Sequence, residues 1–138
     1  MSENTKPRKA EFLVRVKEKL DASGDLKTAM GGTRWWNNVP QDTKLPILRF
    51  RFSQANEFDT KDSDGWQGTL SIDVWTDSRG DLESTKIQDI VDDIFQDGEF
   101  ALQDGQNLFI QHTFFDAFTE PDGITHHAVT QYNVIITN

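Results

Sequence analysis

Residues 45–76 read LPILRFRFSQANEFDTKDSDGWQGTLSIDVWT, two runs of alternating side chains with a charged loop between them. The inward face is apolar in both runs and consists of Leu48, Phe50 and Phe52, then Leu70, Ile72 and Val74. A period of two residues is typical of a half-buried β-strand. The stretch therefore predicts an antiparallel hairpin, with an acidic loop over residues 56–65 that we expect to be mobile.

A helix is predicted on each side of this hairpin. Upstream, the chain turns helical from Pro7, and a stripe with the helical period consists of Phe12, Leu13, Val16 and Leu20. We expect this helix to end near Asp21 with Gly24 as its C-cap. Downstream, the pattern predicts a helix over residues 82–96, with Asp81 at the N-cap and Gly98 at the C-cap. Its apolar stripe is Ile87, Ile90, Val91, Ile94 and Phe95.

Two further strands complete the prediction, on either side of the turn at residues 120–123. The earlier one is expected to present Leu108, Ile110, Phe114 and Phe118 on one face, and the last one Ala128, Tyr132, Val134 and Ile136. A short strand at residues 100–102 is also predicted. We interpret residues 25–44 as an irregular connection and residues 1–6 as frayed.

These elements predict one α+β domain over residues 1–138. Its expected core is a mainly antiparallel sheet of four strands, or slightly more, with two helices packed on it in the order α-β-β-α-β-β. The length of 138 residues is enough to bury a core, and ten Phe and four Trp supply large apolar side chains.

Charge is distributed unevenly along the chain, whose net charge is -9. Residues 1–51 hold 11 Lys and Arg against 6 Asp and Glu, whereas residues 52–138 hold 3 against 17. Faces of opposite sign favour head-to-tail association of identical copies, while a solvated acidic surface is the simpler alternative. No signal peptide or membrane span is expected, because the first residues are polar and no long apolar run occurs.

The sequence offers little for catalysis. Cysteine is absent, which excludes disulfides and thiol chemistry. A histidine metal site would need His112, His126 and His127 together, but consecutive residues of a strand point to opposite faces. The acidic residues 59–64 resemble a calcium loop only loosely, because position 70 is Leu rather than the required Glu. We therefore predict no catalytic, cofactor-binding or metal-binding residues, and no enzyme activity.

Nucleic-acid binding is the alternative that the residues support. Arg34, Trp35 and Trp36, with Arg49 and Arg51 nearby in sequence, combine cations with stacking surfaces. The acidic character of the chain, with a pI of about 4.6, opposes stable contact with phosphates. Trp and Arg are also favoured at protein interfaces, and we prefer to interpret Trp35 and Trp36 as core residues or as interface anchors. A hydrolase with a carboxylate or histidine site is a third and weaker alternative.

Three segments carry a resemblance to a known family: LPILRF at 45–50, DSDGWQGTLSIDVW at 62–75 and the closing strand YNVII at 132–136. With the helix between them, they resemble the tail terminator (tail-completion) proteins of long-tailed bacteriophages over residues 8–138. The resemblance implies a structural protein without cofactors, made in the host cytoplasm and located in the virion at the head-proximal end of the tail.

The resemblance also implies partners. Copies of the chain would form a hexameric ring that caps the major tail tube protein, stops its polymerisation and docks the head-completion or connector protein, with DNA only passing through the lumen. The residues expected at subunit or partner interfaces are Arg34, Trp35, Trp36, Arg49, Arg51, Phe58, Asp59, Asp62, Asp64 and Trp75. The acids expected to face the lumen are Asp89, Asp92 and Asp93.

Overall fold

The computed structural model of the chain describes residues 6–77, 80–96 and 106–138. These residues form, in order, α1 (Lys9–Asp21), α2 (Gly24–Met30), β1 (Trp35–Trp36), β2 (Ile47–Glu57), β3 (Gly65–Thr76), α3 (Leu82–Gln96), β4 (Asn107–Thr119) and β5 (His126–Thr137). The predicted strand at 100–102, the C-cap at Gly98 and the frayed residues 1–5 lie outside the described residues. Within those ranges, no helix has the length and apolar content needed to cross a membrane.

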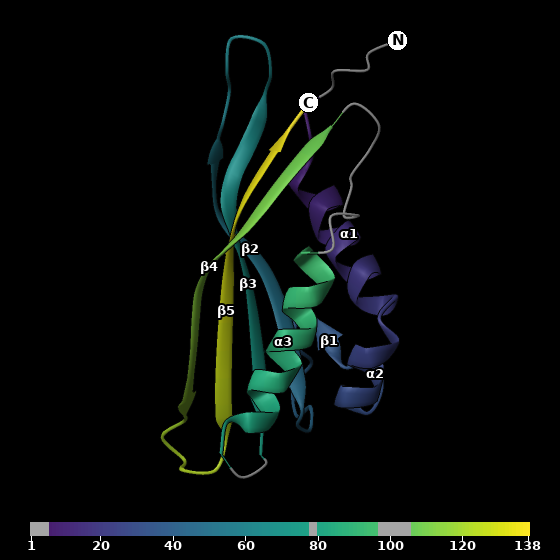
Figure 1. Cartoon of the computed structure of the whole chain (residues 1–138), viewed down its shortest axis with the longest axis vertical. Helices are drawn as coiled ribbons and strands as arrows, with labels where there is room; N and C mark the ends of the chain where they lie inside the picture. The colour runs from purple at the N-terminus through teal and green to yellow at the C-terminus, as the bar shows by residue number, and fades with distance from the viewer. Residues whose placement is uncertain (1–5, 78–79, 97–105) are drawn as a thin grey trace.

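The strands form one twisted sheet in the order β1-β2-β3-β5-β4 (Figure 1). All neighbours pair antiparallel except β1, which runs parallel to β2. The helices lie on one face of this sheet, and none of the described elements covers the other face (Figure 1). The α+β class is confirmed, but the described sheet has five strands and is mixed, and three helices accompany it in the order α-α-β-β-β-α-β-β.

The additional helix and strand lie within residues 24–36, most of which belong to the stretch 25–44 predicted to be irregular. Gly24 begins α2 instead of capping α1, because the Ser23 hydroxyl accepts a hydrogen bond from the Leu26 amide at 3.1 Å and so caps a new helix. Gly31 then ends α2 with a φ of 77°, a left-handed conformation that suits glycine. A seven-residue helix spans too few turns for its apolar periodicity to be recognised.

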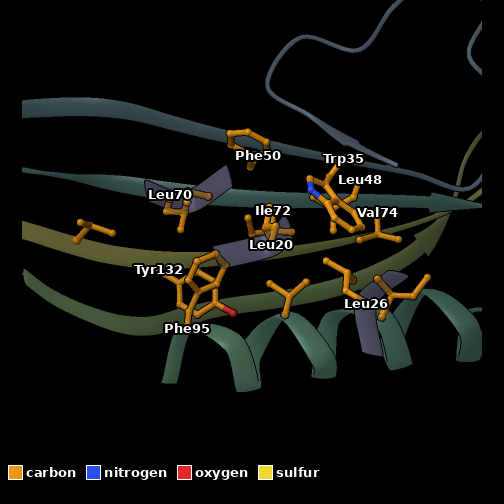
Figure 2. Packing of buried hydrophobic residues seen from close by; sticks show 14 of the residues in the cluster. Leu20, Leu26, Trp35, Leu48, Phe50, Leu70, Ile72, Val74, Phe95 and Tyr132 are labelled. Atoms are coloured by element: carbon orange, nitrogen blue, oxygen red, sulfur yellow. The ribbon is translucent and has the colours of Figure 1, made fainter. Parts of the chain in front are cut away.

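The core lies between the sheet and the helices (Figure 2). The predicted stripes are confirmed: Phe12, Val16 and Leu20 of α1 and Ile87, Val91 and Phe95 of α3 are buried. They pack against the predicted inward faces of the strands, which include Leu48, Leu70, Ile72, Val74, Tyr132 and Val134. Gln88 of α3 is also buried, and its side-chain amide donates to the backbone carbonyls of Ile72 (2.8 Å) and Ala128 (2.9 Å), which joins the helix to β3 and β5.

The predicted face of β4 is wrong beyond its midpoint. A register shift between His112 and Phe114 leaves Thr113 as an extra residue in this strand. Before this bulge, Leu108 and Ile110 lie opposite Ile136 and Val134 on the core side. After it, Phe114 lies opposite Gln131 and Phe118 lies opposite His127, so both phenylalanines point away from the helices. A single inserted residue reverses the side of every later side chain.

The β2–β3 hairpin has the predicted pairing, and its loop is shorter than expected. Asn56 and Glu57 pair with Gln67 and Trp66, so the loop proper comprises residues 58–64. Lys6, expected to be frayed, is held at this end of the hairpin by ion pairs of 3.0 Å to Glu57 and 3.4 Å to Asp59. The hairpin extends well beyond the helices, at the top of Figure 1.

Candidate assembly interface

The uncovered face of the sheet carries a groove at the end where β1 meets β2. Its volume is about 550 Å³, and its lining combines arginine and asparagine side chains with apolar ones: Asn37, Asn38, Val39, Leu45, Ile47, Arg49, Arg51 and Trp75. Alternation along β2 and β3 places Arg49, Arg51 and Trp75 on the side opposite the buried core residues. Three residues of the predicted interface are therefore brought together here.

A charged cluster borders this groove. Arg49 Nη2 lies 3.1 Å from Asp73 Oδ2, and Asp73 Oδ1 lies 2.9 Å from His127 Nε2. The other ring nitrogen of His127, Nδ1, lies 2.8 Å from Glu120 Oε1. The His127 ring also stacks on Trp75, with the ring centroids 4.5 Å apart.

Two carboxylates favour the charged form of His127. Burial opposes a charge on the ring, but the hydrogen bonds to Asp73 and Glu120 and their negative charges raise the pKa of His127 above its ordinary value. Burial likewise opposes ionisation of Asp73, yet His127 and Arg49 lower the pKa of this carboxyl. An imidazolium that donates from both nitrogens has no lone pair for a metal or for a general base. Through these contacts the cluster links β2, β3 and β5 on the open face of the sheet.

Trp35 and Arg34 both make their contacts within the subunit. Trp35 is only 2% exposed and belongs to the core, where its indole N–H donates to Asp21 Oδ1 at 2.8 Å. Arg34 donates to the backbone carbonyls of Pro46, at 2.9 Å, and Lys44, and its guanidinium lies over the Trp36 ring. Of the two roles expected for Trp35, the structure shows the core one, and Arg34 holds the segment before β2 against β1.

The predicted acids at the hairpin tip differ in their surroundings. Asp59 accepts a hydrogen bond from the Gly65 amide at 3.2 Å and forms an ion pair with Lys6. Both contacts lower the pKa of Asp59, and the hydrogen bond from the amide contributes most. Asp62 and Asp64 are exposed, and among the described residues neither carboxylate forms an ion pair. Phe58 is half-buried at the base of the tip.

The acids predicted to face a lumen lie on α3. Asp89 and Asp93 are exposed. Asp92 is half-buried and accepts a hydrogen bond of 2.6 Å from the Tyr132 hydroxyl. Burial, together with this hydrogen bond and the nearby negative charge, raises the pKa of Tyr132 far above its usual value, so the hydroxyl stays a donor. Asp92 therefore has a structural role in addition to any role on the surface.

Exposed phenylalanines on β4 were missed by the sequence analysis. Phe109 is 50% exposed, Phe114 46% and Phe118 42%, and all three lie on the face that the helices leave open. β4 is also an edge strand of the described sheet. The density of aromatic residues between 109 and 118 was a visible signal, but their orientation depended on the bulge.

The described residues contain no cluster of three or more His, Asp or Glu that could hold a metal ion. His112 packs edge-on against Tyr132, and His126 shares a hydrogen bond with Thr119, so each of the three histidines has separate surroundings.

Residues 14–137 match the family described as tail completion protein gp17. The chain belongs to this family. No match is found among curated proteins. Among solved structures, a chain from the "virion of native gene transfer agent (GTA) particle" has a similar fold, with a TM-score of 0.77, 17% identity, and coverage of 89% of this chain and 92% of that chain.

Membership establishes the class of function. A tail completion protein is a structural component of a phage-like virion, located in the tail, and this family is not one of enzymes. The resemblance found in the sequence is thereby confirmed.

Proposed function

We propose that this tail completion protein acts as the tail terminator. Copies of the chain form a ring on the head-proximal end of the tail tube, stop its polymerisation and provide the docking surface for the head-completion or connector protein. The ring is hexameric, as the resemblance implies.

The observation that carries this proposal is the uncovered face of the sheet with its aromatic edge strand. Phe109, Phe114 and Phe118 expose large apolar side chains on the strand at the sheet edge. Soluble monomers seldom expose such patches, and an unpaired edge offers backbone hydrogen-bonding groups to another chain. A subunit that is buried on this side by assembly accounts for both features.

The acids of α3 fit a lumen through which DNA passes. Asp89 and Asp93 are exposed on a helix that lies on the opposite side of the sheet from the phenylalanines. Negative charge on a lumen wall repels phosphates and lets DNA move without binding. The chain then meets DNA only as cargo, and the burial of Trp35 removes the central stacking residue of the alternative, a nucleic-acid-binding module.

Residues 56–65 are proposed to become ordered against a neighbouring subunit or the tube. Within the loop the Thr60 amide donates to the Ser63 carbonyl at 2.7 Å, and the Thr60 hydroxyl contacts Ser63 as well. This turn gives the tip a defined shape, while the loop projects away from the rest of the domain (Figure 1).

The test is assembly with purified tail tubes. The chain is mixed with tube protein during polymerisation, and tube length and end structure are measured by negative-stain electron microscopy. We expect closed rings on one end of each tube and shorter tubes as the ratio of chain to tube protein rises. Tubes that grow to the same length with uncapped ends would overturn the proposal.

A further inference from the structure

We propose that the acidic tip of the β2–β3 hairpin, residues 58–64, binds in the groove beside Arg49 and Arg51 of the next copy of the chain. This contact rests on the proposed function, since it is a contact between neighbouring subunits of the ring. The proposal thus names the two surfaces that join neighbouring subunits: the hairpin tip of one copy and the groove of the next.

The groove has unused capacity to bind anions. Arg51 is exposed, and no ion pair is found for it among the described residues. Arg49 gives one guanidinium nitrogen to Asp73 and adds its positive charge to the groove. The apolar side chains of Ile47 and Trp75 next to these arginines reduce the access of water, which strengthens a charge–charge contact made there.

The tip supplies the complementary charge. Asp62 and Asp64 project their carboxylates into solvent, whereas Asp59 is already held by Gly65 and Lys6. Arginine binds carboxylates with paired hydrogen bonds in a fixed geometry. The tip is narrow, because the Thr60–Ser63 turn closes it, and it is the part of the hairpin that extends furthest from the helices (Figure 1).

The two surfaces cannot meet within one subunit. They lie at opposite ends of the same hairpin, and at about 3.3 Å per residue the stretch of β2 from Arg51 to Glu57 separates them by roughly 20 Å. A contact between two different surfaces of identical copies is heterologous, and its repetition closes a ring when the rotation between copies allows it. The basic N-terminal and acidic C-terminal parts of the sequence thus meet across each interface.

Charge reversal tests the contact. The variants are Arg51→Glu, Asp62→Arg with Asp64→Arg, and the combination of all three changes; Lys86→Glu on α3 is the matched control. Ring formation on tubes and in solution is measured by electron microscopy and analytical ultracentrifugation, and thermal melting checks the fold of each variant.

Arg51→Glu reverses the charge of the groove only, and Asp62→Arg with Asp64→Arg reverses that of the tip only. Each of these two variants is expected to weaken ring formation at least about tenfold, because like charges then face each other. The combined variant is expected to recover most of the wild-type level, and Lys86→Glu to keep it. Rings that form unchanged in all variants overturn the contact and leave the proposed function intact. Failure of the combined variant to recover also overturns it, and indicates that the tip or the groove binds the tube protein instead.

Cysteine cross-linking provides a second measurement that does not depend on charge. The chain contains no cysteine, so Arg51→Cys combined with Asp62→Cys introduces the only thiols. The roughly 20 Å between them excludes a disulfide within one chain, because the two Cα atoms of a disulfide lie less than about 7 Å apart. A ladder of disulfide-linked oligomers on a non-reducing gel is expected; oxidation of assembled rings that yields only monomers overturns the contact.

Discussion

Replacing His127 with glutamine should remove a charged link that stabilises the open face of the sheet, and the effect should depend on pH. His127 Nε2 lies 2.9 Å from Asp73 and its Nδ1 lies 2.8 Å from Glu120, and Asp73 is almost fully buried, with 8% of its side chain exposed. A hydrogen bond to a charged group contributes about 1.5–3 kcal/mol. Glu120 is more exposed to solvent, so most of the stability lost in the variant comes from the contact with Asp73.

Glutamine keeps a donor but loses the charge, and Arg49 still pairs with Asp73. We therefore expect His127→Gln to lower the free energy of unfolding by about 2 kcal/mol near pH 5.5. For a domain of this size that corresponds to a fall of roughly 8 °C in the melting temperature.

The pH dependence has a definite sign. Because the folded-state pKa of His127 is raised, its contribution is fully present below the unfolded value of about 6.5 and is lost as the pH rises through the folded-state pKa. The lowered pKa of Asp73 makes its contribution present above about 3.8 and lost as the pH falls through its folded-state value. The difference between wild type and variant should thus be largest between about pH 4 and 6.5 and shrink toward pH 9.

The assay is urea denaturation followed by tryptophan fluorescence at several pH values, with His126→Gln as control. His126 bonds to Thr119 near the surface, so its replacement should cost about 0.5 kcal/mol or less. An Asp73→Asn background should remove most of the effect of His127→Gln. The reasoning fails if the wild type and His127→Gln differ by the same amount at pH 5.5 and pH 9.

Three other variants test separate parts of the structure. Gln88→Leu should lower the free energy of unfolding by about 2–4 kcal/mol, because it leaves two buried strand carbonyls without their donor. Thermal melting measures the change in stability, and a loss below about 1 kcal/mol would contradict this prediction. Gly65→Ala should destabilise the fold by about 2 kcal/mol or more, since the added Cβ would lie 2.1 Å from the Ile136 carbonyl oxygen. Gly24→Ala serves as the control in the same experiment, because a Cβ added there has no contact within 4 Å. Phe114→Ser should leave thermal stability nearly unchanged yet reduce ring formation on tubes, because this side chain is exposed in the free subunit. If the variant caps tubes as well as the wild type does, β4 does not take part in the interface.

Much of the fold could be predicted because it depends on local periodicity. The alternation in β2, β3 and β5 and the stripe of α3 each repeat several times, so the faces that are buried could be assigned without knowing what covers them. The bounds of α3 were predicted as observed, since its apolar stripe repeats from Ile87 to Phe95 within a helix of 15 residues. The family resemblance followed from the same segments, because order and spacing of elements are properties of the sequence.

Other features are decided by contacts between distant residues. Trp35 is buried because β1 pairs with β2 and its indole reaches Asp21, and no local pattern records either contact. His127, Asp73 and Glu120 meet only because the register of β5 on β3 places His127 opposite Trp75. The bulge at Thr113 turns Phe114 and Phe118 outward, so two of the three phenylalanines that carry the proposed function owe their orientation to that one extra residue. Periodicity alone determines which side chains share a face within a regular element, whereas register, bulges and pairing determine which faces meet, because those depend on the energy of the whole packed sheet.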